Sequence, residues 1–343
     1  MKAKLLSVIM SVYNGEVYIK EAMDSIINQT YKNWELIVID DCSTDNTFQI
    51  LKSYKDPRIH IIRNEENMRL ASSLNRGLSL ALGDYILRMD ADDICRLDRF
   101  EKQLEFMEKN PHIDISFGKG FWYKDSLILK KTQNISLKPL DLKAVFLFTT
   151  PVMHNCVIAK KKFYETYTYK KEYTHSEDWN LWYRSSKDFK FAGQNEYLIL
   201  YRIHESQTTT STFKESIYVN QYKKNFTEYT KQIGFPISEK EIDFHTSLIC
   251  SQEPVDPLIL KKWFAILLLE NKKYNYYKTS SLMYSFLWVS HGLFLTKRLT
   301  SKNLITILAY IGLGRSLIFY VYKIIYSYLD LAKQKKARKL FSF

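Results

Sequence analysis

The chain has 343 residues, of which 46% are hydrophobic and 25% charged, and its formal net charge is +13. This composition excludes global disorder, and the length favours one large domain with an appendage. Ten glycines exclude collagen-like repeats, and four widely spaced cysteines form no zinc or disulfide pattern, which favours a reducing compartment. The positive charge implies an acidic partner, but no nucleic-acid-binding motif accompanies it.

The first 110 residues alternate between strand and helix patterns. The apolar run 5–12 is followed by polar residues without a cleavage site, so we interpret it as a buried strand and not as a signal peptide. We expect further strands at 35–40, 58–63 and 84–90, and helices at 16–29, 43–54, 70–82 and 96–110. This alternation predicts an α/β fold whose mostly parallel sheet binds ligands beyond the carboxyl ends of its strands.

The later part of the chain changes character. Residues 113–160 indicate short strands and a helix near 139–149, and a further helix and strand are expected at 177–186 and 191–204. From about residue 212 the pattern is helical and apolar. We therefore predict a first domain over residues 1–210 and a helical C-terminal region over residues 211–343.

The strongest chemical motif is the acidic group at the end of the fourth predicted strand, residues 89–93. Alternate strand residues face the same side, so Asp90 and Asp92 are expected to point together. Two carboxylates at that spacing suit a hard divalent cation that keeps open positions for phosphate oxygens. The alternative is a solvated acidic turn.

Two neighbouring strand ends, 11–16 and 39–45, are expected to meet at the same edge of the sheet. There the ring of Tyr13 could stack on a base, and Asp41 could accept a hydrogen bond from a uracil imide or a sugar hydroxyl. The alternative is that Asn14 begins a turn and that Asp41 caps a helix.

Two further segments carry titratable side chains. Asp178, at the start of the predicted helix 177–186, is a candidate general base over a sugar acceptor. Alternatively, Glu177 and Asp178 only favour the positive helix start while Trp179 packs in the core. His204 is either a neutral imidazole metal ligand or a hydrogen-bonded structural residue.

Taken in order, these segments resemble the family 2 glycosyltransferases, which have the GT-A fold, a Rossmann-like sheet flanked by helices, and are inverting. The matching residues are 7–14, 35–47, 71–93, 176–184 and 201–204, so the resemblance covers about residues 1–210. It implies transfer of a sugar from a nucleotide sugar, such as a UDP-hexose or UDP-N-acetylhexosamine, to a hydroxyl group, with Mn²⁺ or Mg²⁺.

The resemblance also implies roles for individual residues. The nucleotide-binding residues implied are Ser11, Tyr13, Asn14, Glu16, Asp41, Arg69 and Asp90. Asp92 and His204 are the implied metal ligands, and Asp93 lies behind them. Asp178 is the implied catalytic base, with Glu177 beside it. His154 and Trp179 are the implied acceptor contacts.

Two other enzyme classes fit the sequence less well. A glycosidase also uses two carboxylates but needs no nucleotide pocket. A dinucleotide-binding oxidoreductase would need GxGxxG after the first strand, where this chain has SVYNGE. A non-catalytic sugar-nucleotide-binding or scaffold protein on the same fold remains the alternative, and donor hydrolysis would distinguish it from an enzyme.

The C-terminal region contains the apolar stretches 279–296 and 304–329 and ends in 331–343, with five basic residues and no acid. A membrane span, a soluble helical bundle and an interfacial helical domain are all compatible with this pattern. The interfacial interpretation predicts an anionic membrane surface as partner, a cytoplasmic location at the inner face of the plasma membrane, and a lipid-linked acceptor. Such an acceptor would be a growing capsule, O-antigen or lipooligosaccharide chain of a bacterium.

Overall fold

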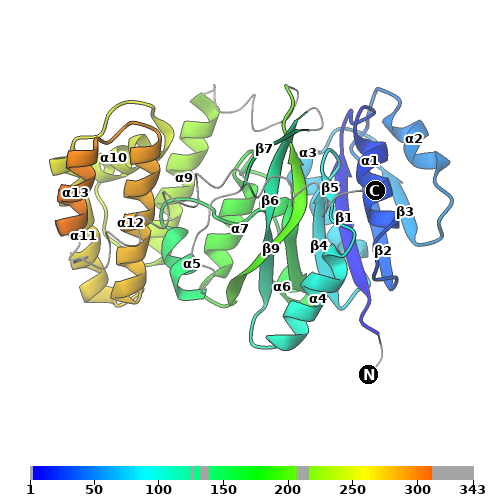
Figure 1. Cartoon of the computed structure of the whole chain (residues 1–343), viewed down its shortest axis with the longest axis horizontal. Coiled ribbons are helices and arrows are strands. Elements are labelled where there is room, and N and C mark those ends of the chain that lie inside the picture. The colour runs from blue at the N-terminus through cyan, green and yellow to red at the C-terminus, as the bar shows by residue number, and fades with distance from the viewer. Residues whose placement is uncertain (1–2, 125–126, 132–138, 206, 208–215, 311–343) are drawn as a thin grey trace. The chain divides into compact units, whose positions relative to one another are not determined.

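The structure is a computed structural model of the chain and describes residues 3–124, 127–131, 139–205, 207 and 216–310 (Figure 1). The chain divides into two compact units. The first comprises Met1–Pro139 and Thr150–Gln221, and the second comprises Leu140–Thr149 and Tyr222–Phe343. The domain boundary predicted near residue 211 lies outside the described residues. The assignment of residues 140–149 to the second unit has no counterpart in the sequence prediction.

The first four strands of the first unit form the parallel half of its sheet. They are β1 (Leu6–Val12), β2 (Trp34–Asp40), β3 (Ile59–Arg63) and β4 (Tyr85–Asp90), in the spatial order β3-β2-β1-β4. The helices between and after them are α1 (Ile19–Ile27), α2 (Thr47–Ser53), α3 (Arg69–Leu80) and α4 (Arg99–Lys109). The strands and helices predicted over this stretch are therefore confirmed, with ends shifted by a few residues.

The two faces of β1 are covered by different helices. Val8 and Met10 belong to a buried cluster with apolar residues of α1, α2 and α4. Ile9 points to the other face, where α3 approaches closely enough that a Cβ on Gly77 would lie 2.7 Å from the Ile9 Cγ2 atom. A side chain at position 77 would therefore push α3 off the sheet. Both faces are covered, which explains why the strand has a continuous apolar sequence.

The rest of the sheet mixes strand directions. Its strands are β5 (Ile94–Cys95), β6 (Ile115–Lys124), β7 (Leu127–Lys131), β8 (Val157–Lys160) and β9 (Phe191–Arg202). The spatial order continues β4-β8-β6-β9-β5, and β7 pairs with β6. β8 is antiparallel to both β4 and β6, and β6 is parallel to β9. The carboxyl end of β9 consequently lies at the same edge of the sheet as the carboxyl end of β4.

Short helical segments connect these strands. They are α5 (Pro139–Val145), the 3₁₀ turn η1 (His154–Cys156), α6 (Lys161–Thr166) and α7 (Glu177–Ser185). The helices expected near 139–149 and at 177–186 are present. The expectation of only short strands in residues 113–160 was wrong for β6, which has ten residues.

The described part of the second unit is helical, as the sequence predicted. Its helices are α9 (Ser216–Gln232), of which the first residues belong to the first unit, α10 (Glu239–Cys250), α11 (Pro257–Tyr274), α12 (Thr279–Leu295) and α13 (Ser301–Tyr310). Ser238 and Glu241 form a capping box at the start of α10. The core is aromatic: the ring of Phe226 stacks on His245 at 3.6 Å between centroids, and Phe264 stacks on Phe286 at 4.2 Å.

The segment 140–149 is part of this aromatic core. Phe148 is fully buried, and its ring stacks on His245 at 5.1 Å. The backbone carbonyl of Phe148 accepts a hydrogen bond from the Tyr222 hydroxyl at 2.6 Å, and the Lys143 carbonyl accepts one from Tyr229 at 3.4 Å. The chain thus leaves the first unit after Pro139, contributes to the core of the second, and returns at Thr150.

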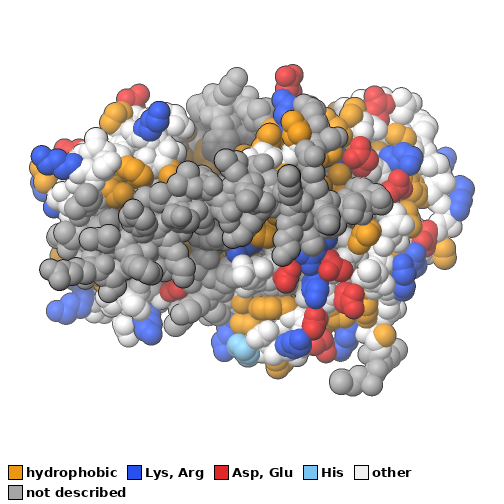
Figure 2. All heavy atoms as spheres, in the orientation of Figure 1, with side chains coloured by type: hydrophobic (Ala, Val, Ile, Leu, Met, Phe, Trp, Pro, Cys, Tyr) orange, Lys and Arg blue, Asp and Glu red, His pale blue; other side chains and the backbone are white. Residues whose placement is uncertain are grey.

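Among the described residues, no helix is long and apolar enough to cross a membrane. Residues 311–343, which include most of the apolar stretch 304–329 and all of the basic segment 331–343, lie outside the described residues. On the face that Figure 2 shows, acidic and basic side chains of the described residues are interspersed.

Candidate active site

The predicted site residues at the ends of β1, β2, β4 and β9, and in the loops that follow them, lie at one edge of the sheet. Ser11, near the end of β1, is half-buried and pairs in register with Ile39 of β2 and Asp90 of β4. Tyr13 follows β1 and is 50% exposed, so its ring is available to stack on a ligand. The edge therefore brings the end of β1 next to the acidic residues that follow β4.

Asn14 and Glu16 join the loop after β1 to the loop after β2. Asn14 has a positive φ of 50°, and its side-chain oxygen accepts a hydrogen bond from the Thr44 N–H at 2.8 Å. Glu16 Oε2 accepts hydrogen bonds from the backbone and side-chain nitrogens of Asn46, at 2.9 and 2.7 Å. These contacts order the two loops, and the nucleotide contacts of both residues stay predictions.

Asp41 directly follows β2, is 2% exposed, and accepts hydrogen bonds from backbone N–H groups at the start of α3. Its Oδ1 accepts hydrogen bonds from the Met68 N–H at 2.8 Å and from the Asn64 and Ser73 side chains at 2.6 and 2.9 Å. Its Oδ2 accepts a hydrogen bond from the Arg69 N–H at 2.8 Å. A carboxylate has about four acceptor positions, two on each oxygen, so Oδ2 can accept a further hydrogen bond from a ligand.

Arg69 lies at the first position of α3 with a φ of 66°, a left-handed conformation that costs a non-glycine residue energy. Its backbone N–H bond to Asp41 holds it there, and its side chain is exposed. The hydrogen bond from the Arg69 N–H to Asp41 therefore fixes the backbone position from which the guanidinium group extends. Its contact with the nucleotide stays a prediction.

Asp90, Asp92 and Asp93 each offer a carboxylate oxygen, and these atoms lie within 4.8 Å of one another. Burial raises the pKa of Asp90 and, more strongly, of Asp93, and repulsion from Asp92 raises both further. Three carboxylates held this close repel one another, and a bound cation would relieve that repulsion. Hard oxygen ligands of this kind suit Mg²⁺ or Mn²⁺, so the residues fit the predicted metal.

His204 lies against this cluster from the residues that follow β9. Its Nε2 is 2.9 Å from Asp92 Oδ2, and its side chain is 12% exposed. The ring tilts against Tyr18 with 4.7 Å between centroids, and the backbone N–H donates to Gln207 Oε1 at 2.8 Å. The structure therefore brings together the two residues predicted as metal ligands, which are 112 positions apart in the sequence.

Arg202 ties the acidic loop to β9 and α1. Its backbone N–H donates to Asp93 Oδ1 at 2.8 Å, its Nε donates to the Asp92 carbonyl at 2.8 Å, and its Nη2 pairs with Glu21 at 2.7 Å. The other oxygen of Asp93 accepts a hydrogen bond from the Asn155 side chain. Both oxygens of Asp93 are thus used inside the fold, which places Asp93 behind Asp92 as a positioning residue.

Arg88 is a buried cation beneath the acidic cluster. It is 5% exposed, lies two residues before Asp90 on the same face of β4, and forms an ion pair with the Asp90 carboxylate. Its positive charge lowers the pKa of Glu177 and Asp178, whereas the negative charge of Asp90 raises both. The Arg88–Asp90 pair therefore influences the pKa of the candidate base, and its Asp90 also belongs to the candidate metal site.

Glu177 and Asp178 begin α7, and the Trp179 N–H donates to Asp178 Oδ1 at 2.6 Å. The pKa of Asp178 is raised to about 6 and that of Glu177 to about 7, and the largest cause of both shifts is burial. Repulsion between the two carboxylates adds to the shift of Glu177. A carboxyl group with a pKa near 6 is suited to accept a proton at neutral pH.

The two predicted acceptor contacts lie mostly inside the fold. His154 bonds the Tyr169 hydroxyl through Nε2 at 2.6 Å, and burial, helped by the Arg88 charge, holds its pKa well below the ordinary value. The imidazole is therefore neutral at pH 7. Trp179 is 4% exposed and packs edge-on against Tyr183 at 5.9 Å. Both acceptor contacts stay predictions.

Sequence reasoning missed three residues of this site. Arg88 had a visible signal, because it is the lone cation among the apolar residues that precede Asp90 in β4. Arg202 lies in the matching segment 201–204, in which the resemblance implied a role only for His204. Asn155 had no signal, because its contact with Asp93 joins residues 62 positions apart.

The sequence profile of the family described as Glycosyl transferase family 2 matches residues 7–168. An uncharacterized glycosyltransferase of Haemophilus influenzae is 38% identical over 247 residues, which cover 68% of this chain and 76% of the relative. The Escherichia coli enzyme WfgD, a UDP-Glc:alpha-D-GlcNAc-diphosphoundecaprenol beta-1,3-glucosyltransferase, is 32% identical over 217 residues, or 62% of this chain and 82% of the relative.

The crystal structure of residues 1–349 of S. aureus TarS in complex with UDP-GlcNAc has a similar fold. The TM-score is 0.57 at 16% identity, with 91% of each chain covered. The sheet with its flanking helices and helical C-terminal region is thus of the GT-A type. The chain belongs to the family 2 glycosyltransferases, and the fold and family predicted from the sequence are confirmed.

Proposed function

We propose that this chain is an inverting transferase that moves a hexose or N-acetylhexosamine from its UDP donor to a hydroxyl group of a saccharide or lipid-linked acceptor. The observation that carries the proposal is the position of the Arg88–Asp90 pair. The Asp90 carboxylate lies within 4.8 Å of that of Asp92, which pairs with His204, and the charges of Arg88 and Asp90 both act on the raised-pKa carboxyl of Asp178. The donor class is supported by WfgD, named for UDP-Glc, and by the fold neighbour bound to UDP-GlcNAc.

Asp92 and His204 would hold the divalent cation, Mn²⁺ or Mg²⁺, with Asp90 beside them. When bound, such a cation supplies Lewis-acid stabilisation of the negative charge on the departing diphosphate. Arg202 and Asn155 hold Asp93 and the Asp92 backbone, so the direction of the Asp92 carboxylate is fixed before any ligand arrives.

The transfer itself requires one base. Asp178 accepts the proton of the acceptor hydroxyl while the hydroxyl oxygen forms a bond to the anomeric carbon. The bond from that carbon to the diphosphate oxygen breaks on the opposite face, and the nucleoside diphosphate leaves with the bonding electrons. One displacement of this kind inverts the configuration at the anomeric carbon.

The acceptor and location follow from the relatives and the sequence. WfgD is named for a diphosphoundecaprenol-linked acceptor, which supports a lipid-linked acceptor and a role in bacterial surface-polysaccharide synthesis, of capsule or lipopolysaccharide type. An acceptor of that kind lies at the cytoplasmic face of the plasma membrane, where the basic segment 331–343 would contact anionic lipid.

A panel of nucleotide sugars, tested for binding and for Mn²⁺-dependent hydrolysis, is the direct test of this function. One donor should be bound and slowly hydrolysed without an acceptor. Binding without hydrolysis or transfer would favour the non-catalytic alternative, and failure to bind any nucleotide sugar would contradict the proposal.

Replacing Arg202 by glutamine should weaken Mn²⁺ binding by about 10–100-fold, because residues that orient metal ligands contribute about that much to affinity. Titration with Mn²⁺ by calorimetry measures the change. The matched control is Arg58→Gln, which breaks a surface ion pair with Asp56. Equal Mn²⁺ affinity in the Arg202 variant and the control would show that Arg202 does not position the site.

The Arg88 charge should set the acidic limb of the pH–rate profile. The positive charge of Arg88 lowers the pKa of Asp178, so Arg88→Met should raise that pKa. In the wild type, kcat/KM is expected to fall as the pH drops through about 6. In the variant, the fall should begin about one pH unit higher. Arg88→Lys keeps the charge and should stay close to wild type. A folded methionine variant with an unmoved limb would contradict the coupling.

A further inference from the structure

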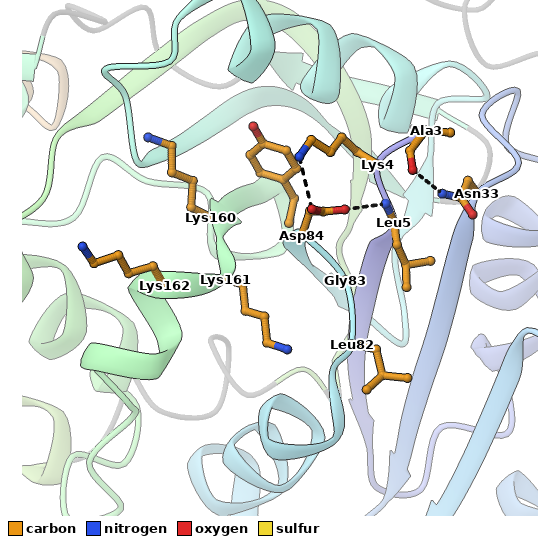
Figure 3. A pocket seen from close by; sticks show the side chains of 11 residues that line it. Ala3, Lys4, Leu5, Asn33, Leu82, Gly83, Asp84, Lys160, Lys161 and Lys162 are labelled. Atoms are coloured by element: carbon orange, nitrogen blue, oxygen red, sulfur yellow. Dashed lines mark hydrogen bonds and ion pairs between the residues drawn. The ribbon is translucent and has the colours of Figure 1, made fainter. Parts of the chain in front are cut away.

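The first unit contains a second candidate ligand site at the opposite edge of its sheet. A cavity of about 780 Å³ is lined at the amino ends of β1 and β4 and at the end of β8 (Figure 3). From Leu6 to Val12, β1 spans about 20 Å at the usual rise of a strand. The cavity is therefore separate from the residues that follow the carboxyl ends of the strands.

The cavity is strongly basic. Four lysines line it against one aspartate: Lys4, Lys160, Lys161, Lys162 and Asp84. Lys4 pairs with Asp84 at 3.2 Å, and Lys160 pairs with Asp114 at 3.0 Å. Among the described residues, no ion pair joins Lys161 or Lys162 to an acidic side chain, so two ammonium groups remain without a counter-charge.

The wall opposite these lysines is held by hydrogen bonds. Within the turn before β4, the Leu82 N–H donates to Glu35 at 2.8 Å and the Gly83 N–H donates to Ser7 Oγ at 2.7 Å. A Cβ on Gly83 would lie 2.6 Å from the Ser7 backbone nitrogen, so only glycine allows this approach. The Lys161 N–H donates to the Asp84 carbonyl at 3.1 Å, which joins the lysine segment to the same turn.

The composition of the lining indicates the class of ligand. Lysine ammonium groups bind phosphate oxygens as point charges. The volume falls within the range of small-molecule sites and exceeds what a free phosphate fills. Leu5 and Leu82, the latter 72% exposed, add apolar lining beside the lysines. A phosphate carried by an organic group matches both parts.

We propose that this cavity binds a phosphate group of an organic molecule, at a site separate from the sugar-nucleotide donor site. Two sources share this chemistry, the headgroup of an anionic phospholipid and a soluble phosphate ester. The two lysines of α6, Lys161 and Lys162, contact the phosphate, and the leucines contact the organic part.

The full-length protein is tested with two probes in the presence of a metal chelator, so that no phosphate binds through a cation at Asp92. The first probe is vesicles of phosphatidylglycerol and phosphatidylcholine, with pure phosphatidylcholine as the neutral reference. The second is glycerol 3-phosphate, measured by calorimetry. The test variant is Lys161→Gln/Lys162→Gln. The matched control, Lys52→Gln/Lys187→Gln, removes two exposed lysines that do not line the cavity.

The double variant should bind the phosphate probe roughly 30-fold more weakly than the control, as expected for two lost lysine contacts. Its donor hydrolysis should equal that of wild type, because neither lysine lies at the donor edge. Loss of vesicle binding alone identifies the lipid headgroup as the source, and loss of glycerol 3-phosphate binding shows that soluble esters suffice. Equal binding by both variants, or no binding of either probe by wild type, would overturn the proposal. The basic segment 331–343 is present in every protein compared and cannot produce the difference.

Discussion

Asp178→Asn should reduce sugar transfer by about 10²–10⁴-fold, the usual contribution of a general base, and leave the affinity for the donor nucleotide unchanged. The reason is that Asp178 acts on the acceptor hydroxyl and not on the nucleotide. The fold should survive, because burial disfavours the ionised form of this carboxyl and the amide removes that charge. Steady-state transfer rates, nucleotide titration and thermal melting measure the three quantities.

The control for this variant is Asp243→Asn, which removes an exposed carboxylate paired with Lys223 in the second unit. That variant should transfer sugar at the wild-type rate. If Asp178→Asn also transfers at the wild-type rate, Asp178 only favours the start of α7 and another group must take the proton. Glu177→Gln would then be the next variant to measure.

Asp92→Asn should lower metal-dependent turnover by about 100-fold or more, since Lewis-acid stabilisation by a bound cation is worth several kcal/mol. The variant should melt at or above the wild-type temperature. The Asp92 side chain is 33% exposed, and its charge raises the pKa of Asp90 and Asp93, so its removal relieves repulsion within the cluster. Donor turnover across a Mn²⁺ series and thermal melting test both statements.

The comparison for Asp92→Asn is again Asp243→Asn, whose Mn²⁺ dependence should match wild type. Full activity of the Asp92 variant at every Mn²⁺ concentration would remove Asp92 from the metal site. A lower melting temperature would mean that the bond from His204 to Asp92 stabilises the fold more than the relieved repulsion does.

The parallel half of the sheet was predictable because its signals are local. β1 is a nearly continuous apolar run, β2 to β4 are rich in apolar residues, and each of the four is followed by a helix with apolar residues at helical spacing. The arrangement of β6, β8 and β9 was not predictable in this way. β8 has only four residues, and its antiparallel pairing with both β4 and β6 depends on contacts between residues far apart in the sequence.

The same distinction applies to the candidate site. The spacing of Asp90 and Asp92 on a strand end shows in a few consecutive letters. Asp178 and His204 were candidates from their own segments, and the family resemblance added their implied roles. The contacts that hold these groups are non-local: Arg202 reaches Asp92 across 110 positions, and Asn155 reaches Asp93 across 62. A single sequence contains no pattern for such pairs, so positioning residues were missed, whereas the candidate reacting residues could be proposed.

The passage of residues 140–149 through the second unit limits how such proteins can be recombined. Exchanging everything after residue 210 between relatives would replace α10 to α12 but leave Phe148 against a foreign aromatic core, without its own Tyr222 and His245. The chain that returns from this segment supplies Asn155, which holds Asp93. A grafted C-terminal region must therefore bring a compatible 140–149 segment with it.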